Sequence, residues 1–251
     1  MSNKRILRHS LLVRTVHWLT VLSTLLLFFS GIGQMPMYKR YMVSDLPGMA
    51  WTADYQMTLI LHYVAAVVFV FTIVMHGVYH FIRKEYAMIP KKGDIKESLL
   101  IVKAMLGFGK EPPSGKFLAE QRLAYAFMAF TVLLLTVTGL IKVGKNFAFW
   151  QISESAMVWV TLLHNIGMVL MLFGIIAHLG AFIAKANRPL VPSIFTGYVS
   201  EEYIKERHSV WYEELTANGG DQDDVEQEPM ADRKYQRQVS QKQADTEDMP
   251  N

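Results

Sequence analysis

Residues 61–80 read LHYVAAVVFVFTIVMHGVYH, a run in which histidines are the only side chains that titrate near neutral pH. Residues 162–178 read LLHNIGMVLMLFGIIAH and have the same character. About 20 mostly apolar residues suffice for a helix to cross a bilayer. Because an ionisable side chain is costly inside a membrane, the histidines of these two runs indicate function.

Two more runs of this kind complete a set of four predicted membrane-spanning helices, at about residues 16–33, 57–82, 123–141 and 156–184. The composition agrees, because 51% of the 251 residues are hydrophobic and only 19% are charged, whereas charged residues make up about 25% of a soluble domain. The absence of cysteine excludes disulfides, thiolate-bound iron–sulfur clusters and covalently attached haem. We therefore predict an all-α integral membrane protein, a four-transmembrane-helix bundle within residues 1–215.

Positive charge is concentrated on one side of the predicted membrane. Basic residues precede the first span, and nine more lie between the second and third spans: Arg83, Lys84, Lys91, Lys92, Lys96, Lys103, Lys110, Lys116 and Arg122. The other two connections carry few basic residues. By the positive-inside rule, both termini and the basic connection face the cytoplasm.

Two segments outside the spans have their own character. Residues 94–107 predict an amphipathic helix along the cytoplasmic membrane surface, with Leu99, Leu100 and Val102 among its apolar residues. Residues 216–251 hold nine acidic and four basic side chains and lack Ile, Leu, Phe and Trp. Such a segment buries too little apolar surface to order itself, so we predict a disordered acidic C-terminal tail.

The histidines inside the spans fall into two levels. His62 and His76 lie 14 residues apart on the second predicted span, and so do His164 and His178 on the fourth. Fourteen residues are close to four helical turns, so each pair shares one helix face, with its members about 21 Å apart. The second and fourth predicted spans run in the same direction across the membrane. His62 and His164 therefore fall at one depth near the outside, and His76 and His178 fall near the cytoplasm, level with His17 on the first span.

Two facing imidazoles at one depth can bind a haem iron from both sides. Two such levels predict a pair of bis-histidine b haems that carry electrons across the membrane. The residues alone leave open whether His17 or His76 is the partner of His178. Arg14, one turn before His17, is a candidate for binding a haem propionate or for a positive-inside anchor. A proton relay, a divalent-metal transporter and a haem-free membrane anchor are the alternatives, and the first two normally require acidic residues inside the membrane.

The chain resembles the gamma subunit, a membrane di-haem cytochrome b, of respiratory formate dehydrogenases. The likeness covers roughly residues 10–215 and rests on an ordered set of short motifs, which are weak singly and specific together. They are Arg14-Thr15-Val16-His17-Trp18, Leu61-His62, Ile89-Pro90-Lys91-Lys92-Gly93-Asp94-Ile95, Gly115-Lys116-Phe117, Gln121-Arg122, Thr138-Gly139, Leu162-Leu163-His164 followed by His178, Gly197-Tyr198-Val199-Ser200 and His208-Ser209-Val210-Trp211-Tyr212-Glu213-Glu214-Leu215.

This resemblance implies electron transfer, with no catalytic residue for formate oxidation in this chain. In the family, a molybdenum or tungsten catalytic alpha subunit oxidises formate, and an iron–sulfur beta subunit passes the electrons to the outer haem. The electrons cross to the inner haem and reduce menaquinone or ubiquinone near the cytoplasmic face of the bacterial inner membrane. By motif match, His62 and His164 bind the outer haem iron, and His17 and His178 bind the inner one, with His76 as the alternative ligand.

The resemblance also places the quinone near the start of the third predicted span. Gln121 matches a polar position of the family, whereas Leu118 and Glu120 stand where a family member has asparagine and glycine. Glu120 is then a candidate proton donor to the quinone or a solvated interfacial charge. Cytochromes of this type also serve hydrogenases, thiosulfate reductases and other molybdoenzymes, which is the alternative assignment. We expect a lipid bilayer and protein subunits as partners, and no nucleic acid.

Overall fold

The computed structural model describes residues 4–217 and 225–226. Within this part of the chain, four helices are long and apolar enough to cross a membrane. They are α1 (Leu11–Gly33), α3 (Tyr55–Arg83), α5 (Ala119–Asn146) and α6 (Glu154–Gly180). The prediction of a helical bundle with four membrane-spanning helices is therefore confirmed.

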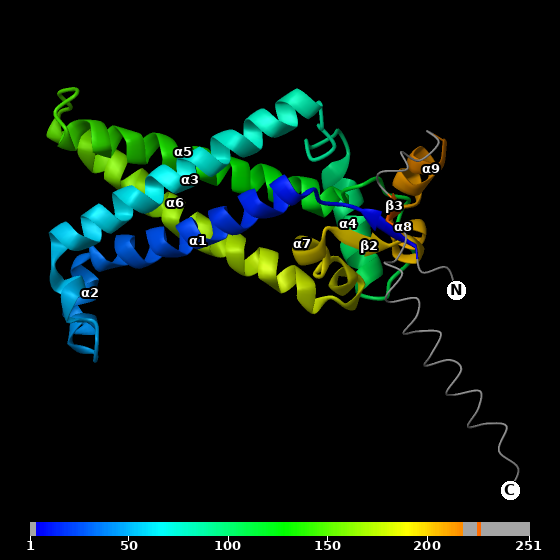
Figure 1. Ribbon diagram of the computed structural model, residues 1–251, viewed down its shortest axis with the longest axis horizontal. Helices are drawn as coiled ribbons and strands as arrows, with labels where there is room; N and C mark the ends of the chain where they lie inside the picture. Colours follow the sequence, from blue (N-terminus) through cyan, green and yellow to red (C-terminus); the bar gives the residue numbers. More distant parts are fainter. Residues whose placement is uncertain (1–3, 218–224, 227–251) are drawn as a thin grey trace, which may run out of the picture.

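The four long helices form two antiparallel hairpins, α1 with α3 and α5 with α6 (Figure 1). The helix α2 (Pro36–Arg40) and the 3-10 turns Val43–Asp45 and Ala50–Ala53 connect the first hairpin, and residues 147–153 connect the second. Both connections lie at one end of the bundle, which we call the distal end (Figure 1). The N-terminal strand and the C-terminal helices lie at the opposite end, which we call the terminal end.

Side-chain caps explain why three of these helices begin before the apolar runs. The Ser10 hydroxyl accepts a hydrogen bond from the Val13 amide at 3.4 Å, and the Ser153 hydroxyl accepts one from the Ala156 amide at 3.3 Å. One carboxylate oxygen of Asp54 accepts two amide protons at the start of α3. Such caps satisfy amides that have no partner inside the helix. Hydropathy detects only the membrane-crossing part of a helix, so the predicted starts fall inside the observed ones.

The helix α4 (Asp94–Met105) packs against the start of α5. The buried Asp94 carboxylate accepts two hydrogen bonds from the Arg122 guanidinium, at 2.9 and 2.6 Å. The Arg122 hydrogen bond holds the pKa of Asp94 below its usual value. Ile101 is the buried apolar residue of α4, while Leu99 is exposed. The predicted helix is therefore present, and an ion pair together with Ile101 fixes it to the bundle.

Short elements close the terminal end of the bundle. The strand β1 (Arg5–Leu7) pairs antiparallel with β2 (Tyr198–Ser200) and with β3 (Val225–Glu226), in the order β2-β1-β3. The segment between α6 and β2 contains the 3-10 turns Ala181–Ile183 and Lys185–Leu190 and the short helix α7 (Ser193–Thr196), and α8 (Glu201–Arg207) and α9 (Ser209–Ala217) follow β2. A small core holds this region together and consists of Ile6, Val199, Ile204 and Trp211. The sequence gives no sign of this sheet, because strands of two or three residues are too short to show an alternating pattern.

The predicted acidic tail, residues 216–251, lies mostly outside the described residues. Residues 216–217 end α9, and Val225 and Glu226 form β3 on the free edge of β1. Residues 218–224 and 227–251 are not described, so the prediction of disorder stays a prediction for them.

Candidate functional site

His62 on α3 and His164 on α6 face each other in the distal half of the bundle. Their ring centroids are 6.5 Å apart, and the ring planes are inclined by 66°. One ring comes from each hairpin, and both side chains are half-buried. The structure therefore brings together the two histidines that the 14-residue spacing places at one depth. We call this pair and its neighbours the distal level.

A hydroxyl group on the neighbouring helix holds each of these rings. Ser30 Oγ on α1 lies 2.9 Å from Nδ1 of His62, and Thr138 Oγ1 on α5 lies 2.8 Å from Nδ1 of His164. Each hydroxyl also donates its own proton to a backbone carbonyl one turn back, at 2.6 Å in both cases. The hydroxyl oxygens must then accept the Nδ1 protons, which leaves Nε2 of both imidazoles with a free lone pair.

This arrangement fits a metal ion bound between the two rings. A metal–imidazole bond is about 2 Å long and the ring centre lies about 1 Å behind the nitrogen, so two imidazoles on opposite sides of one ion have centroids about 6 Å apart. The observed separation of His62 and His164, 6.5 Å, agrees with that value. The hydrogen bond at Nδ1 fixes the ring orientation and makes Nε2 a stronger ligand. Axial imidazoles are ligands that haem iron accepts.

The level nearer the terminal end, which we call the terminal level, contains two different pairs. His17 on α1 and His178 on α6 lie close enough for a charge on one ring to act on the other. His76 on α3 instead approaches α5, where its Nε2 lies 3.4 Å from the Tyr125 hydroxyl. The structure thus places His17 close enough to His178 for an electrostatic interaction, and it places His76 beside Tyr125.

The two hairpins repeat one pattern of polar positions. Each carries a ring-bearing side chain, a hydroxyl residue 13 positions later, and two histidines 14 positions apart. The members are His17, Ser30, His62 and His76 in the first hairpin, and Tyr125, Thr138, His164 and His178 in the second. In both hairpins a glycine follows the hydroxyl residue, and a β-carbon on Gly31 or Gly139 would lie 3.5 Å from Cε1 of the held histidine. Tyr125 is therefore the counterpart of His17, and His76 is the counterpart of His178.

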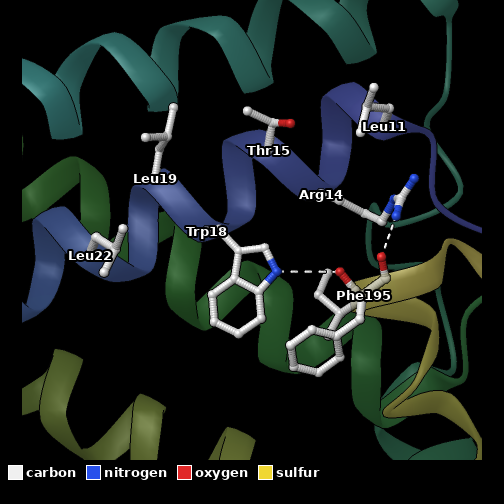
Figure 2. A pocket seen from close by; sticks show the side chains of 8 residues that line it. Leu11, Arg14, Thr15, Trp18, Leu19, Leu22 and Phe195 are labelled. Atoms are coloured by element: carbon white, nitrogen blue, oxygen red, sulfur yellow. Dashed lines mark hydrogen bonds between the residues drawn. The ribbon is translucent and has the colours of Figure 1, made fainter.

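Arg14 borders an open pocket of about 360 Å³ beside α1 (Figure 2). Its guanidinium donates a hydrogen bond to the Phe195 carbonyl, and the Trp18 indole lies 3.4 Å from the Ile194 carbonyl (Figure 2). The remaining lining is mostly leucine: Leu11, Thr15, Leu19 and Leu22. The Nε atom of Arg14 is buried and has no hydrogen-bond partner among the described residues. One donor of Arg14, one turn from His17, is thus left without a hydrogen-bond partner among the described residues.

Glu120 and Gln121 lie in the first turn of α5, at the terminal end. Both carboxylate oxygens of Glu120 are buried and lack a hydrogen-bond partner among the described residues, which argues against a solvated surface charge. Gln121 Oε1 accepts the Leu118 amide at 3.2 Å and so caps α5. Leu118 itself is fully buried. The carboxylate is thus the more available polar group of the two, because part of the Gln121 amide is used by the backbone.

Buried polar groups hold the terminal end together. His208 Nδ1 lies 2.7 Å from a backbone carbonyl of the loop before α5, and burial, together with the charge of Arg8, lowers the pKa of His208 to about 4. Arg8 donates to the Lys116 carbonyl at 2.7 Å, and burial lowers the pKa of Arg8 to about 10. Arg207 pairs with Glu111 at 2.9 Å. These contacts link the segments before α1, before α5 and after α6.

Sequence reasoning missed Ser30 and Tyr125, and it noted Thr138 only as part of a motif, without its role beside His164. Serine and threonine in apolar helices mostly bond their own backbone, so each alone carries little signal. The signal that finds them is the repeat, because aligning the first and third spans at a fixed offset pairs Ser30 with Thr138 and His17 with Tyr125.

Comparisons with known proteins bear on this arrangement. A family model described as prokaryotic cytochrome b561 matches residues 8–197. The chain is similar to the "Formate dehydrogenase, cytochrome b556 subunit" of Haemophilus influenzae, with 22% identity over 219 residues that cover 85% of this chain and 84% of that protein. It is also similar to the "Formate dehydrogenase, nitrate-inducible, cytochrome b556(Fdn) subunit" of Escherichia coli K12, with 27% identity over 221 residues that cover 85% of this chain and 93% of that protein. The region matched by the family model includes all four long helices and both histidine levels.

Proposed function

Because the chain belongs to the prokaryotic cytochrome b561 family, we propose that it is the membrane cytochrome b subunit of a formate dehydrogenase. Two similar proteins carry that name and align over 85% of this chain. Membership of a cytochrome b family implies haem b, and four apolar helices make the chain a multi-pass membrane protein. The number of haems, the electron path and the quinone site are the finer parts of the proposal.

The observation that carries the proposal is the distal pair, His62 and His164. Two imidazoles from different hairpins face each other, and hydroxyl partners at both Nδ1 atoms leave both Nε2 atoms free to bind iron. Haem bound there would supply a one-electron carrier. The chain's own contribution is to fix both rings and to surround them with apolar helices, which tunes the potential.

A second b haem is proposed at the terminal level, between His17 and His178. The support is the 14-residue spacing between the two levels and the proximity of these two rings. His76 is disfavoured as a ligand because its Nε2, the atom that would bind iron, approaches the Tyr125 hydroxyl. Arg14, with a buried Nε and no partner for it among the described residues, is the proposed propionate contact. The two levels lie about 21 Å apart along the helices.

The proposed electron path runs from the distal end to the terminal end. An iron–sulfur beta subunit, itself reduced by a molybdenum or tungsten alpha subunit that oxidises formate, would dock at the distal connections. The terminal level would then reduce menaquinone or ubiquinone. The excess of basic residues near the terminal end favours a cytoplasmic location for that end in a bacterial inner membrane.

The quinone is proposed to bind near the start of α5, close to Glu120 and Gln121. A buried carboxylate without a hydrogen-bond partner is costly and calls for a function. Glu120 would give a proton to the reduced quinone, since both of its oxygens are unpaired among the described residues. The Glu120→Gln substitution should slow quinol formation while the haem spectrum stays unchanged. Normal turnover in that variant would refute this role for Glu120.

A pyridine haemochrome assay on the purified chain, followed by formate-driven reduction of the assembled complex, tests the whole proposal. Two b haems per chain, both reduced by formate, are expected. One haem per chain would limit the haem assignment to a single level. A folded, membrane-inserted chain without haem would remove the electron-transfer function and leave an anchor or a transporter. Reduction by hydrogen, and not by formate, would assign the cytochrome to a different partner enzyme.

A further inference from the structure

We propose that Glu85, His80, His76 and Tyr125 form a proton-conducting chain from the terminal surface to the level of quinone reduction. This inference rests on the proposed function, because a quinone takes up two protons for every two electrons that reach it. The feature that motivates it is the second polar pair of the terminal level. By the repeat, His76 is the counterpart of His178, and Tyr125 is the counterpart of His17. His76 and Tyr125 are hydrogen-bonded to each other.

Consecutive members of the chain are in contact. Glu85 Oε2 lies 3.3 Å from Nδ1 of His80. The rings of His80 and His76 have centroids 4.4 Å apart and are inclined by 63°. His76 Nε2 lies 3.4 Å from the Tyr125 hydroxyl on the next helix. Four titratable groups therefore follow one another without an apolar residue between them.

The position of the chain in the fold gives it an entrance and a direction. Glu85 lies just beyond the end of α3, and 36% of its side-chain surface is exposed. His80 and His76 are four residues apart, so they lie on one face of α3 and lead inward. Tyr125 lies one turn beyond Gln121 on the same face of α5, which is the region proposed for the quinone. The chain thus joins solvent to the proposed site of proton demand.

Charged and polar groups around the entrance are suited to hold Glu85 and His80 in place. Arg83 lies 3.6 Å from Glu85 Oε1. The Tyr79 ring packs edge-on against His80, and the Tyr79 hydroxyl bonds to Ser10 at 3.2 Å. Lys116 lies close enough to act electrostatically on His80. The Tyr79 hydroxyl is engaged with Ser10, the cap of α1, so it stands beside the proton-conducting chain and not within it.

Proton transfer along these groups balances without an additional reactant. A proton bound to Glu85 passes to Nδ1 of His80, and the other nitrogen of His80 releases one to His76. His76 passes a proton from Nε2 to the Tyr125 oxygen as the Tyr125 hydroxyl proton moves on to a quinone oxygen. Each transfer breaks one O–H or N–H bond and forms another. No electrons move along these four side chains, because those that reduce the quinone would arrive through the proposed haems.

The test separates electron arrival from proton delivery in the assembled complex. His76→Gln, His80→Gln and Tyr125→Phe should keep two b haems per chain and normal haem reduction by formate. Quinol formation should fall at least tenfold and show a larger solvent deuterium isotope effect. Added imidazole should partly restore the rate of His80→Gln, an effect that a purely structural role for His80 would not produce. The His80 side chain is 23% exposed and lies near the end of α3, so this variant keeps the test valid even if His76→Gln fails to fold.

Tyr79→Phe is the matched control, since it removes one phenol hydroxyl beside His80 but outside the chain. It should leave quinol formation unchanged. Wild-type rates in both His76→Gln and His80→Gln would overturn the inference, and so would loss of a haem in His76→Gln, because His76 would then be an iron ligand. A wild-type complex without haem or quinone reduction would instead refute the proposed function itself.

Discussion

The distal and terminal levels show two outcomes of one repeated hairpin. At the distal level, His62 and His164 are counterparts of each other, and each has the same hydroxyl partner geometry. The repeat therefore yields one pair, made of equivalent residues. At the terminal level, the repeat yields two pairs made of non-equivalent residues. A level with two different pairs offers two different kinds of site, one for each pair.

The division depends on one ring. His17 and Tyr125 occupy equivalent positions. Tyr125 lies against His76 of the other hairpin, and His17 lies close enough to His178 of the other hairpin for an electrostatic interaction. An imidazole at this position offers a second ligand to iron, while a phenol hydroxyl offers a hydrogen bond that occupies the facing Nε2. We infer that this exchange of histidine for tyrosine separates a haem-binding pair from a hydrogen-bonded pair.

The largest effect is expected from removing one member of the distal pair. His164→Ala takes away one of the two proposed ligands of the distal iron and should lower the haem b content from the proposed two per chain to one. Formate should then no longer reduce the proposed terminal haem, because the proposed electron path would be broken at its first carrier. The pyridine haemochrome assay and the reduced-minus-oxidised spectrum measure both effects. Retention of two haems would mean that the distal pair is not a ligand pair.

The terminal level offers a direct contrast between His17 and His76. His17→Ala should lose one haem per chain, whereas His76→Gln should keep both. The reason is that His17 lies close enough to His178 for an electrostatic interaction, while His76 Nε2 lies beside the Tyr125 hydroxyl. The opposite result, with haem lost only in the His76 variant, would reverse the assignment of the two terminal pairs.

The ion pair between α4 and α5 should support the terminal level alone. Asp94→Asn leaves the buried Arg122 guanidinium without its bidentate partner. Breaking a buried pair costs about 3–5 kcal/mol, so the free energy of unfolding should fall by about that amount. Thermal unfolding in detergent measures this loss, and the spectrum should change for the terminal haem only.

Glu97→Gln is the control for Asp94→Asn. Glu97 lies 3.6 Å from Arg122, and a third of its side-chain surface is exposed. Exposed ion pairs contribute at most about 1 kcal/mol, so this variant should unfold almost as the wild type does. Equal destabilisation by the two substitutions would contradict the view that burial of the Asp94 carboxylate makes the pair important.

Acidification should destabilise the terminal end of the bundle at a higher pH than it destabilises the distal level. Burial holds the pKa of His208 at about 4, below the value of about 6.5 in an unfolded chain. His208 is therefore neutral when folded, and its contribution to stability is complete above pH 6.5 and falls as the pH drops toward 4. Between pH 7 and pH 5 the loss is about 2 kcal/mol.

Amide hydrogen exchange in α9 measures this pH effect, and His208→Gln should flatten its dependence on pH. His9 contributes a slope of the same sign, because burial and then the charge of Arg8 lower the pKa of His9 to about 3. The pH dependence of exchange that remains in His208→Gln should therefore be removed by His9→Gln. Exchange in α9 that is independent of pH in the wild type would show that His208 is not protonated on opening.

The comparison of levels also marks what the sequence could predict. Long apolar runs and a 14-residue histidine spacing suffice for the four helices and for pairing His62 with His164, because helical periodicity is regular. The partner of His178 could not be predicted from depth alone, since His17 and His76 fall at the same level. That choice depends on which helix of the first hairpin lies nearest His178. It also depends on the Tyr125 hydroxyl beside His76, which no apolar pattern reveals. The sheet of β1, β2 and β3 rests on pairing between distant segments and left no periodic signal either.

The smallest effects are expected from the two hydroxyl groups of the distal level, and they test whether its halves are equivalent. Ser30→Ala and Thr138→Val each remove one acceptor from a histidine Nδ1–H. One hydrogen bond is worth about 0.5–1.5 kcal/mol, which for a one-electron carrier corresponds to a potential shift of about 20–60 mV. A weaker ligand stabilises oxidised iron less, so the reduction potential of the proposed distal haem should rise in both variants.

Ser23→Ala and Thr131→Val are the matched controls, since these hydroxyls lie on the same two helices and bond only to backbone carbonyls. They should leave the distal potential unchanged in a redox titration. If Ser30 and Thr138 act equally, the shifts in the two single variants should be equal and should add in the double variant, because each acts on a different ring. A shift in one variant only would mean that the repeat preserves the positions of the hydroxyls but not their function.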